Sequence, residues 1–248
     1  MIKRNYYKIV RVFPDPSSYF YIKNETMNEG WIDLFLFTPE RLNEMTLDYS
    51  FDKVNWTRVT EYNNSNIYIP ADGYMYLRNT TGVFGTDTQV FSPHFNISIG
   101  GDIRTLFNYT DVESVTKIPD YGFYYPFTMQ ENSKCIDISN LSFRGITEIG
   151  NYGLQNTFGS GFTGTKGVDL RDVTTLGEGA LRELYSDNPY LTEVYAPNIS
   201  TWDTNKTEWW LSNVAPTGVV YKPSTLTIPT DTNAGIPYGW TTQDYPVE

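Results

Sequence analysis

The chain has 248 residues, a formal net charge of -11 and an aromatic content of 16%, with 20 tyrosines. This length suits two modules. The acidic balance, without a Lys/Arg cluster, excludes a nucleic-acid partner, because neutralising phosphates requires a concentrated basic face. A single cysteine, Cys135, excludes an intrachain disulfide framework and a multi-thiolate metal site. We also expect no membrane span and no secretory signal, since no segment is apolar enough for either.

The first half of the sequence reads as short strands. Apolar and polar residues alternate in five segments, which are separated by turn residues: 31–37, 46–52, 56–62, 66–79 and 95–101. Period-two alternation gives each strand one buried face, so we expect an antiparallel β-sandwich over 46–116, completed by strands from 1–45. The apolar runs "YYKIVRVF" and "WIDLFLF" predict an exposed sheet edge, so we expect residues 1–45 to be ordered by, or to contribute to, contact with another subunit.

A repeat marks the second half. "ITEIGNYGLQNTF" (146–158) and "VTTLGEGALREL" (173–184) align when Ile149 is placed on Leu176. Strand-like segments near 135, 167, 193 and 218 share this repeat, and they align on four apolar residues spaced by 32, 26 and 25: Ile136, Val168, Val194 and Val219. One strand and one or two helical turns in each unit predict a short leucine-rich-repeat solenoid with a C-terminal cap over 117–248. The alternative is chance similarity among Gly/Thr/Leu-rich segments.

Catalytic patterns are mostly absent. The only histidine, His94, leaves no room for a histidine-based zinc site, and its neighbours favour a structural role. Two acid pairs have the residue types that glycoside cleavage needs, Asp111 with Glu113 and Asp169 with Asp172, but both read as solvent-facing. We therefore expect a protein without catalytic residues, cofactor or metal.

Two aromatic clusters are the candidates for recognition. One lies in "STWDTNKTEWWLSN", the other in "DYGFYYPF". Such clusters anchor protein interfaces or stack on sugar rings. The predicted interaction surface comprises five residues: Trp202, Trp209, Trp210, Tyr121 and Tyr124. The alternative is that these rings form a hydrophobic cap on the end of the solenoid.

Three segments carry a resemblance to a known family. "LDYSFDKVNWTRVTEYNNSNIYIPADGYMYLRN" with "ISIGGDIRTLFNY" resembles the Ig-like module that precedes leucine-rich repeats in proteins of gut Bacteroidetes and their tailed phages. "VDLRDVTTLGEGAL" is similar to the BspA-type repeat, and "GVVYKPSTLTIPTDTNAGIPYGWT" to the closing segment of the same proteins. The resemblance covers about 47–248, with about four repeats.

The resemblance implies binding rather than catalysis. Since no secretory signal is seen, it favours a structural or decoration protein of a tailed-phage virion, assembled in the host cytoplasm. Such a protein would be oligomeric in the assembled particle and would bind other capsid or tail proteins and a host surface or its glycans. The alternatives are a bacterial cell-surface adhesin or glycan-binding protein and, more remotely, a hydrolase that uses paired acids.

Overall fold

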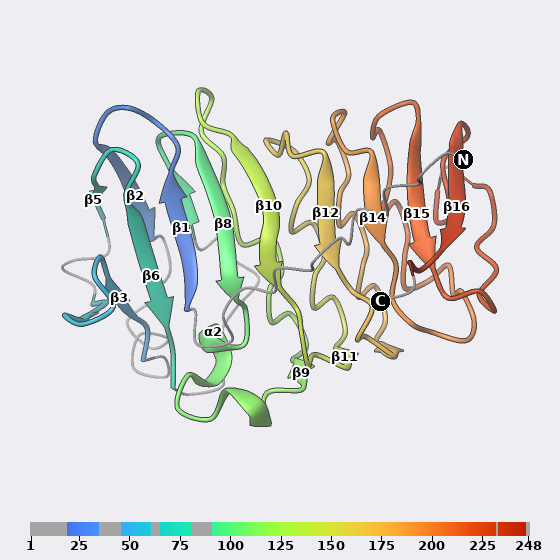
Figure 1. Cartoon of the computed structure of the whole chain (residues 1–248), viewed down its shortest axis with the longest axis horizontal. Helices are drawn as coiled ribbons and strands as arrows, with labels where there is room; N and C mark the ends of the chain where they lie inside the picture. Colours follow the sequence, from blue (N-terminus) through green and yellow to red (C-terminus); the bar gives the residue numbers. More distant parts are fainter. Residues whose placement is uncertain (1–18, 35–45, 61–64, 81–90, 232, 247–248) are drawn as a thin grey trace, which may run out of the picture.

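The computed structural model describes residues 19–34, 46–60, 65–80, 91–231 and 233–246. The protein is mainly β, as its strand-forming patterns predict. In the described part, the only helical elements are a four-residue helix α2 (Thr105–Asn108) and a 3-10 turn η1 (Val112–Ser114). The strands lie side by side and follow one another along the long axis of the molecule (Figure 1). No helix in these ranges has the length and hydrophobicity that crossing a bilayer requires.

A six-stranded sheet forms the larger layer of the first half, in the order β10-β8-β1-β6-β3-β4. Neighbouring strands in this sheet run antiparallel, except for β10 and β8, which are parallel. The strands are β1 (Phe20–Asn24), β3 (Asp48–Ser50), β4 (Thr57–Arg58), β6 (Tyr74–Arg78), β8 (Ile97–Asp102) and β10 (Cys135–Ser142). The alternation in β1 buries Phe20 and Ile22 and leaves the residues between them partly exposed.

A second sheet, in the order β5-β2-β7, packs against the first. It contains β2 (Gly30–Leu34), β5 (Ile67–Ile69) and β7 (Phe91–Pro93). The rings of Phe20 on β1 and Phe91 on β7 stack 6.0 Å apart, so side chains of the two sheets meet in one core.

Of residues 1–45, the structure describes 19–34, and most of these belong to the two sheets. β1 lies between β6 and β8, and β2 lies between β5 and β7. Four of their apolar side chains have no accessible surface, Phe20, Ile22, Ile32 and Leu34, whereas Trp31 is 39% exposed. β1 and β2 are therefore interior strands of the two sheets rather than an exposed sheet edge. "YYKIVRVF" lies outside the described residues.

The second half is a stack of parallel strands in two rows. One row is β13-β11-β9 and the other is β12-β14-β15-β16. The strands are β9 (Lys117–Ile118), β11 (Glu148–Ile149), β12 (Lys166–Asp169), β13 (Thr175–Leu176), β14 (Glu193–Tyr195), β15 (Gly218–Lys222) and β16 (Trp240–Asp244). Ile149 pairs with Leu176, which confirms the predicted alignment of the two repeat copies. Further along the copies, Phe158 and Tyr185 stack at 5.9 Å.

Two of the four predicted equivalent positions are shifted. Val194 pairs with Val220 rather than with Val219. Ile136 is 41% exposed, and it is the preceding residue, Cys135, that is buried. β10 carries register shifts on both sides of Asp137, and in a strand a slip of one residue moves each side chain to the opposite face.

β10 joins the two halves. On one side it pairs with β8, and on the other the Cys135 N–H donates to the Gly161 carbonyl at 3.0 Å. The Thr163 N–H donates back to the Cys135 carbonyl at 2.8 Å, and Figure 1 shows β10 between β8 and β12. The predicted boundary at 116/117 is therefore crossed by a sheet that runs on from the first half into the second.

Candidate functional site

Tight turns, rather than the predicted helical turns, connect the two rows of strands. Along these segments alternate backbone N–H groups donate to the next coil, as from Leu154 to the Ala180 carbonyl at 3.0 Å. The N–H groups between them close turns within their own coil, as from Gln155 to the Tyr152 carbonyl at 3.2 Å. The turns therefore stack on one another through a backbone ladder of their own.

The turns have a period of four residues. Residues four apart adopt left-handed backbone angles, with φ between 43° and 63°: Tyr121, Tyr125, Tyr152, Asn156, Gly179, Glu183, Asp187, Trp209 and Asn213. This region costs most L-residues about 1–2 kcal/mol, and the hydrogen bonds to neighbouring coils offset that cost. Side chains two positions further on, such as Leu154 and Phe158, are buried. The left-handed positions carry the side chains of the outer surface.

Four of these positions form what we call the outer row: Tyr125, Asn156, Glu183 and Trp209. The Tyr125 N–H donates to the carbonyl of the residue before Asn156 at 2.9 Å. In the same way, the Asn156 N–H donates to the carbonyl of the residue before Glu183, and the Glu183 N–H to that of the residue before Trp209. The four side chains therefore occupy successive coils. Since hydrogen-bonded strands lie about 4.8 Å apart, the row spans about 14 Å.

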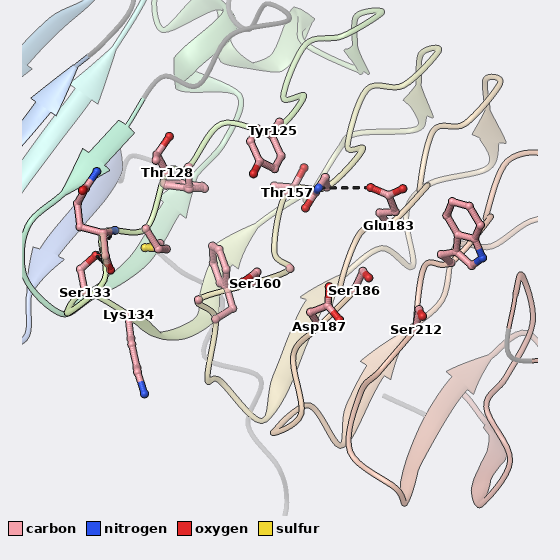
Figure 2. A pocket seen from close by; sticks show the side chains of 18 of the residues that line it. Tyr125, Thr128, Ser133, Lys134, Thr157, Ser160, Glu183, Ser186, Asp187 and Ser212 are labelled. Carbon is pink, nitrogen blue, oxygen red and sulfur yellow. Dashed lines mark hydrogen bonds between the residues drawn. The ribbon is translucent and has the colours of Figure 1, made fainter.

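A groove with a volume of about 710 Å³ follows this row. Figure 2 shows it running from the loop that carries Thr128, Ser133 and Lys134, past Ser160, Glu183 and Asp187, to Ser212. Hydroxyl, amide and charged groups make up much of the lining. Tyr125 and Trp209, each 37% exposed, are the aromatic members of the outer row in this lining.

The charges of the groove are mostly negative. Its lining includes the carboxylates of Glu131, Glu183 and Asp187 against the single amine of Lys134. Asn156 Nδ2 donates to Glu183 Oε2 at 3.3 Å, the dashed line in Figure 2. This bond fixes the amide and the carboxylate side by side between the two aromatic rings.

A cation lies over the ring of Trp209. The Arg182 guanidinium lies 5.3 Å from the centre of the indole ring and forms an ion pair with Glu208 at 3.2 Å. A cation over an indole face is an attractive contact. The ring therefore has a preferred orientation before any ligand arrives.

The predicted tryptophans divide between the groove and the core. Trp209 lines the groove, but Trp210 is only 1% exposed and cannot belong to an interaction surface. Its indole N–H donates to the Gly235 carbonyl, and that of half-buried Trp202 to the Ala234 carbonyl, both at 2.7 Å. These two rings pack 4.9 Å apart against the core. Both rings therefore pack into the interior of the stack and are bonded to the segment that follows their own coil.

The predicted tyrosines lie beside the groove rather than in it. Tyr121 is exposed and stacks on Tyr152 at 5.2 Å, with Tyr124 edge-on at 5.7 Å. The groove instead uses Tyr125, one turn further along. Asn156 and Glu183 were not predicted, although aligning the two repeat copies places them on one another.

No protein-family model, curated protein or solved structure matches the chain.

Three of the four acids considered for hydrolysis have structural partners. Glu113 forms an ion pair with buried Arg104 at 3.2 Å. Asp169 pairs with Arg171 at 2.9 Å, and Asp172 accepts the Gly145 N–H at 3.0 Å. Glu113, Asp169 and Asp172 thus each stabilise a turn or an ion pair of the scaffold.

His94 and Cys135 also have structural surroundings. His94 Nε2 lies 2.9 Å from Asp33 Oδ2, and its ring stacks on Trp31 at 4.9 Å. Burial raises the pKa of the Cys135 thiol well above its usual value, which disfavours the reactive thiolate. Within the described residues, no group of three His, Cys, Asp or Glu side chains is placed to hold a metal.

Proposed function

We propose that the protein is a non-enzymatic structural or decoration protein of a tailed-phage virion, a scaffold that links the particle to a host surface. The first half attaches to other capsid or tail proteins, and the groove of the second half faces outward. In this proposal the two packed sheets are an Ig-like sandwich, and the stacked coils are a short leucine-rich-repeat solenoid with its C-terminal cap.

The repeat geometry supports this assignment of fold. Ile149 pairs with Leu176, 27 residues later, and Val194 with Val220, 26 residues later. The coils bury their apolar side chains against one another, because one coil cannot cover its own apolar face.

One observation carries the proposed function: the molecule has two separate surfaces suited to binding, one in each half. The first is a tyrosine patch on β1 and β6, formed by Tyr21, Tyr74 and Tyr76. The Tyr74 and Tyr76 rings stack at 5.8 Å, and Tyr21 lies edge-on to Tyr74 at 5.3 Å. The second surface is the groove, lined by the segment just before β10 and by the coils that follow it (Figure 1). A protein with both surfaces can hold two partners at once.

The tyrosine patch suits a protein partner. Tyrosine combines apolar contact area with a hydrogen-bonding hydroxyl and is enriched at interfaces. Burial raises the pKa of Tyr21 to about 12, so this hydroxyl stays protonated at neutral pH. Lys23 and Lys53 lie near the rings of Tyr74 and Tyr76, respectively. We assign this face to a neighbouring virion subunit.

The second candidate function, a bacterial cell-surface adhesin or glycan-binding protein, is favoured by the same groove. An exposed indole in a polar groove can bind a ligand in either setting, on a virion or on a bacterial cell. The two candidates differ in location: virion, after assembly in the host cytoplasm, or bacterial envelope.

Mass spectrometry of purified virions, with cryo-electron microscopy of the same particles, tests the leading proposal. We expect the chain in intact particles, in a regular number of copies. Tyr74→Ala should reduce its incorporation, whereas Tyr68→Ala on β5, which is more exposed but outside the patch, should not. Absence from intact particles, with the protein found on bacterial cells instead, would reject the virion role in favour of the adhesin.

A further inference from the structure

We propose that the groove binds a neutral oligosaccharide chain laid across the stacked coils, with Tyr125 and Trp209 as platforms for two of its sugar rings. This inference deepens the proposed function, since it takes the groove as the outward-facing surface and names the chemistry of its ligand.

The two aromatic rings have the placement that sugar binding requires. The residues that carry them stand at the two ends of the outer row, with backbones about 14 Å apart by three steps of the ladder. Both are partly exposed, and Trp209 is oriented by the Arg182 guanidinium. The flat faces of such rings pack on the apolar faces of pyranose rings. A ligand that touches both must extend across the two intervening coils.

The groups between the rings suit hydroxyls. Asn156 and Glu183 lie side by side, and together they supply an amide donor and several acceptor oxygens. Beside them, each of the next three coils adds one serine to the lining: Ser160, Ser186 and Ser212. A hydroxyl can either donate or accept, as can the hydroxyls of a sugar. The lining repeats with the coils, as the hydroxyls of a polysaccharide repeat along its chain.

The charge of the groove selects against anionic glycans. The lining contains three carboxylates and one ammonium group, in a chain whose net charge is -11, and one of the three, Glu183, also lies 3.8 Å from the Arg182 guanidinium. A sulfated or sialylated chain would meet like charges at close range. A neutral chain has no such cost.

A peptide is the other ligand with extended shape, and the backbone disfavours it. Peptides that bind as an added strand depend on free main-chain N–H and C=O groups at a sheet edge. Along the outer row, the N–H groups of Tyr125, Asn156 and Glu183 already donate to neighbouring coils. The surface offers side chains rather than an open edge.

The test uses the full chain and an array of neutral hexasaccharides with gluco, manno, xylo and galacto configurations. Sulfated and sialylated oligosaccharides and a nonalysine peptide are the comparison probes. We expect binding to at least one neutral chain, with an affinity that changes little between about 0.05 and 0.5 M salt, because no net charge is neutralised. Isothermal titration calorimetry then measures the affinity for that probe.

Matched variants locate the binding. Tyr125→Ala and Trp209→Ala should each weaken it by about tenfold or more. Tyr121→Ala is the control for Tyr125, because it is the same residue type, exposed, and left-handed at φ 56°, yet outside the groove. Trp31→Ala on β2, 39% exposed, is the control for Trp209. Circular dichroism confirms that each variant is folded.

Glu183→Gln separates the two ligand classes. It keeps the shape and hydrogen-bonding capacity but removes the charge, so the affinity for a neutral glycan should fall by less than about threefold. Strong, salt-sensitive binding of nonalysine that Glu183→Gln abolishes, with no glycan binding, would replace the inference with a basic peptide.

Failure to bind any neutral chain, or equal losses in Tyr121→Ala and Tyr125→Ala, would also overturn the inference. Neither outcome touches the virion role, which the composition of the particles decides independently.

Discussion

Replacing Tyr185 by phenylalanine removes one buried oxygen from the interior of the stack. Tyr185 is 1% exposed, and its hydroxyl accepts the Val168 N–H at 2.9 Å, on the strand that starts the same coil. The ring remains stacked on Phe158, so packing is almost unchanged. Leaving a buried N–H without a partner costs about 1–3 kcal/mol. Phenylalanine avoids the desolvation of a hydroxyl, which returns part of this cost, so we expect the free energy of unfolding to fall by about 1–2 kcal/mol.

Urea denaturation followed by tryptophan fluorescence measures this loss, and calorimetry should show a decrease in Tm of roughly 2–8 °C for a chain of this size. Tyr190→Phe, at an exposed tyrosine, is the control and should stay within about 0.5 kcal/mol of the wild type. A Tyr185→Phe variant as stable as the wild type, with an unchanged denaturant slope, would refute the assigned hydrogen bond.

The same residue predicts an alkaline effect. Burial raises the pKa of Tyr185 above its ordinary value of 10.0, so above pH 10 the unfolded chain loses this proton before the folded chain does. The stabilising contribution of the protonated hydroxyl is complete below pH 10 and is lost as the pH rises further. The stability of the wild type should therefore decrease more steeply above pH 10 than that of Tyr185→Phe. Equal slopes would contradict the raised pKa.

Three other substitutions or reactions test the scaffold. Gly101→Ala should reduce the free energy of unfolding by about 2–4 kcal/mol in urea titrations, because Gly101 has φ +83° and a Cβ there would collide with the Tyr19 carbonyl. Arg104→Leu should cost about 3–5 kcal/mol in the same measurement, since it leaves Asp102 buried without its ion pair at 2.8 Å. Cys135 should not react with a thiol reagent until the protein is unfolded, because burial raises its pKa; rapid labelling of the folded chain would contradict this.

Local patterns in the sequence predicted the strands well where one face is buried. Met75 and Leu77, in the predicted segment 66–79, alternate with exposed or partly exposed neighbours, a period typical of strands, whereas β1 was not among the predicted segments. The repeat alignment also placed Ile149 on Leu176, as observed. It failed at Ile136, because a register shift in β10 depends on pairing with β8 and leaves no local signature.

The turn segments were harder to predict because their period imitates a helix. Apolar residues four apart, such as Leu154 and Phe158, are typical of one helix face. Here the same spacing arises from turns with a left-handed residue at every fourth position. What separates the two structures is hydrogen bonding to the neighbouring coil, which a single segment does not show.

The groove was only partly predictable for the same reason. Trp209 was identified because its segment is rich in aromatic residues. Its neighbour Trp210 is buried in the core, and only the register of the backbone ladder distinguishes the two. Asn156 and Glu183 lie 27 residues apart in sequence and bond across coils. Their juxtaposition is a property of the stack rather than of either segment.

The continuity of the sheet through β10 has a consequence for avidity. Since β10 is hydrogen-bonded to β8 on one side and to residues 161–163 on the other, the groove keeps a fixed position and orientation relative to the first half. Copies anchored side by side would then hold their grooves at equal intervals. On a surface that presents the ligand many times, the overall affinity would then exceed the weak affinity of one groove, since every further contact forms at a high effective concentration.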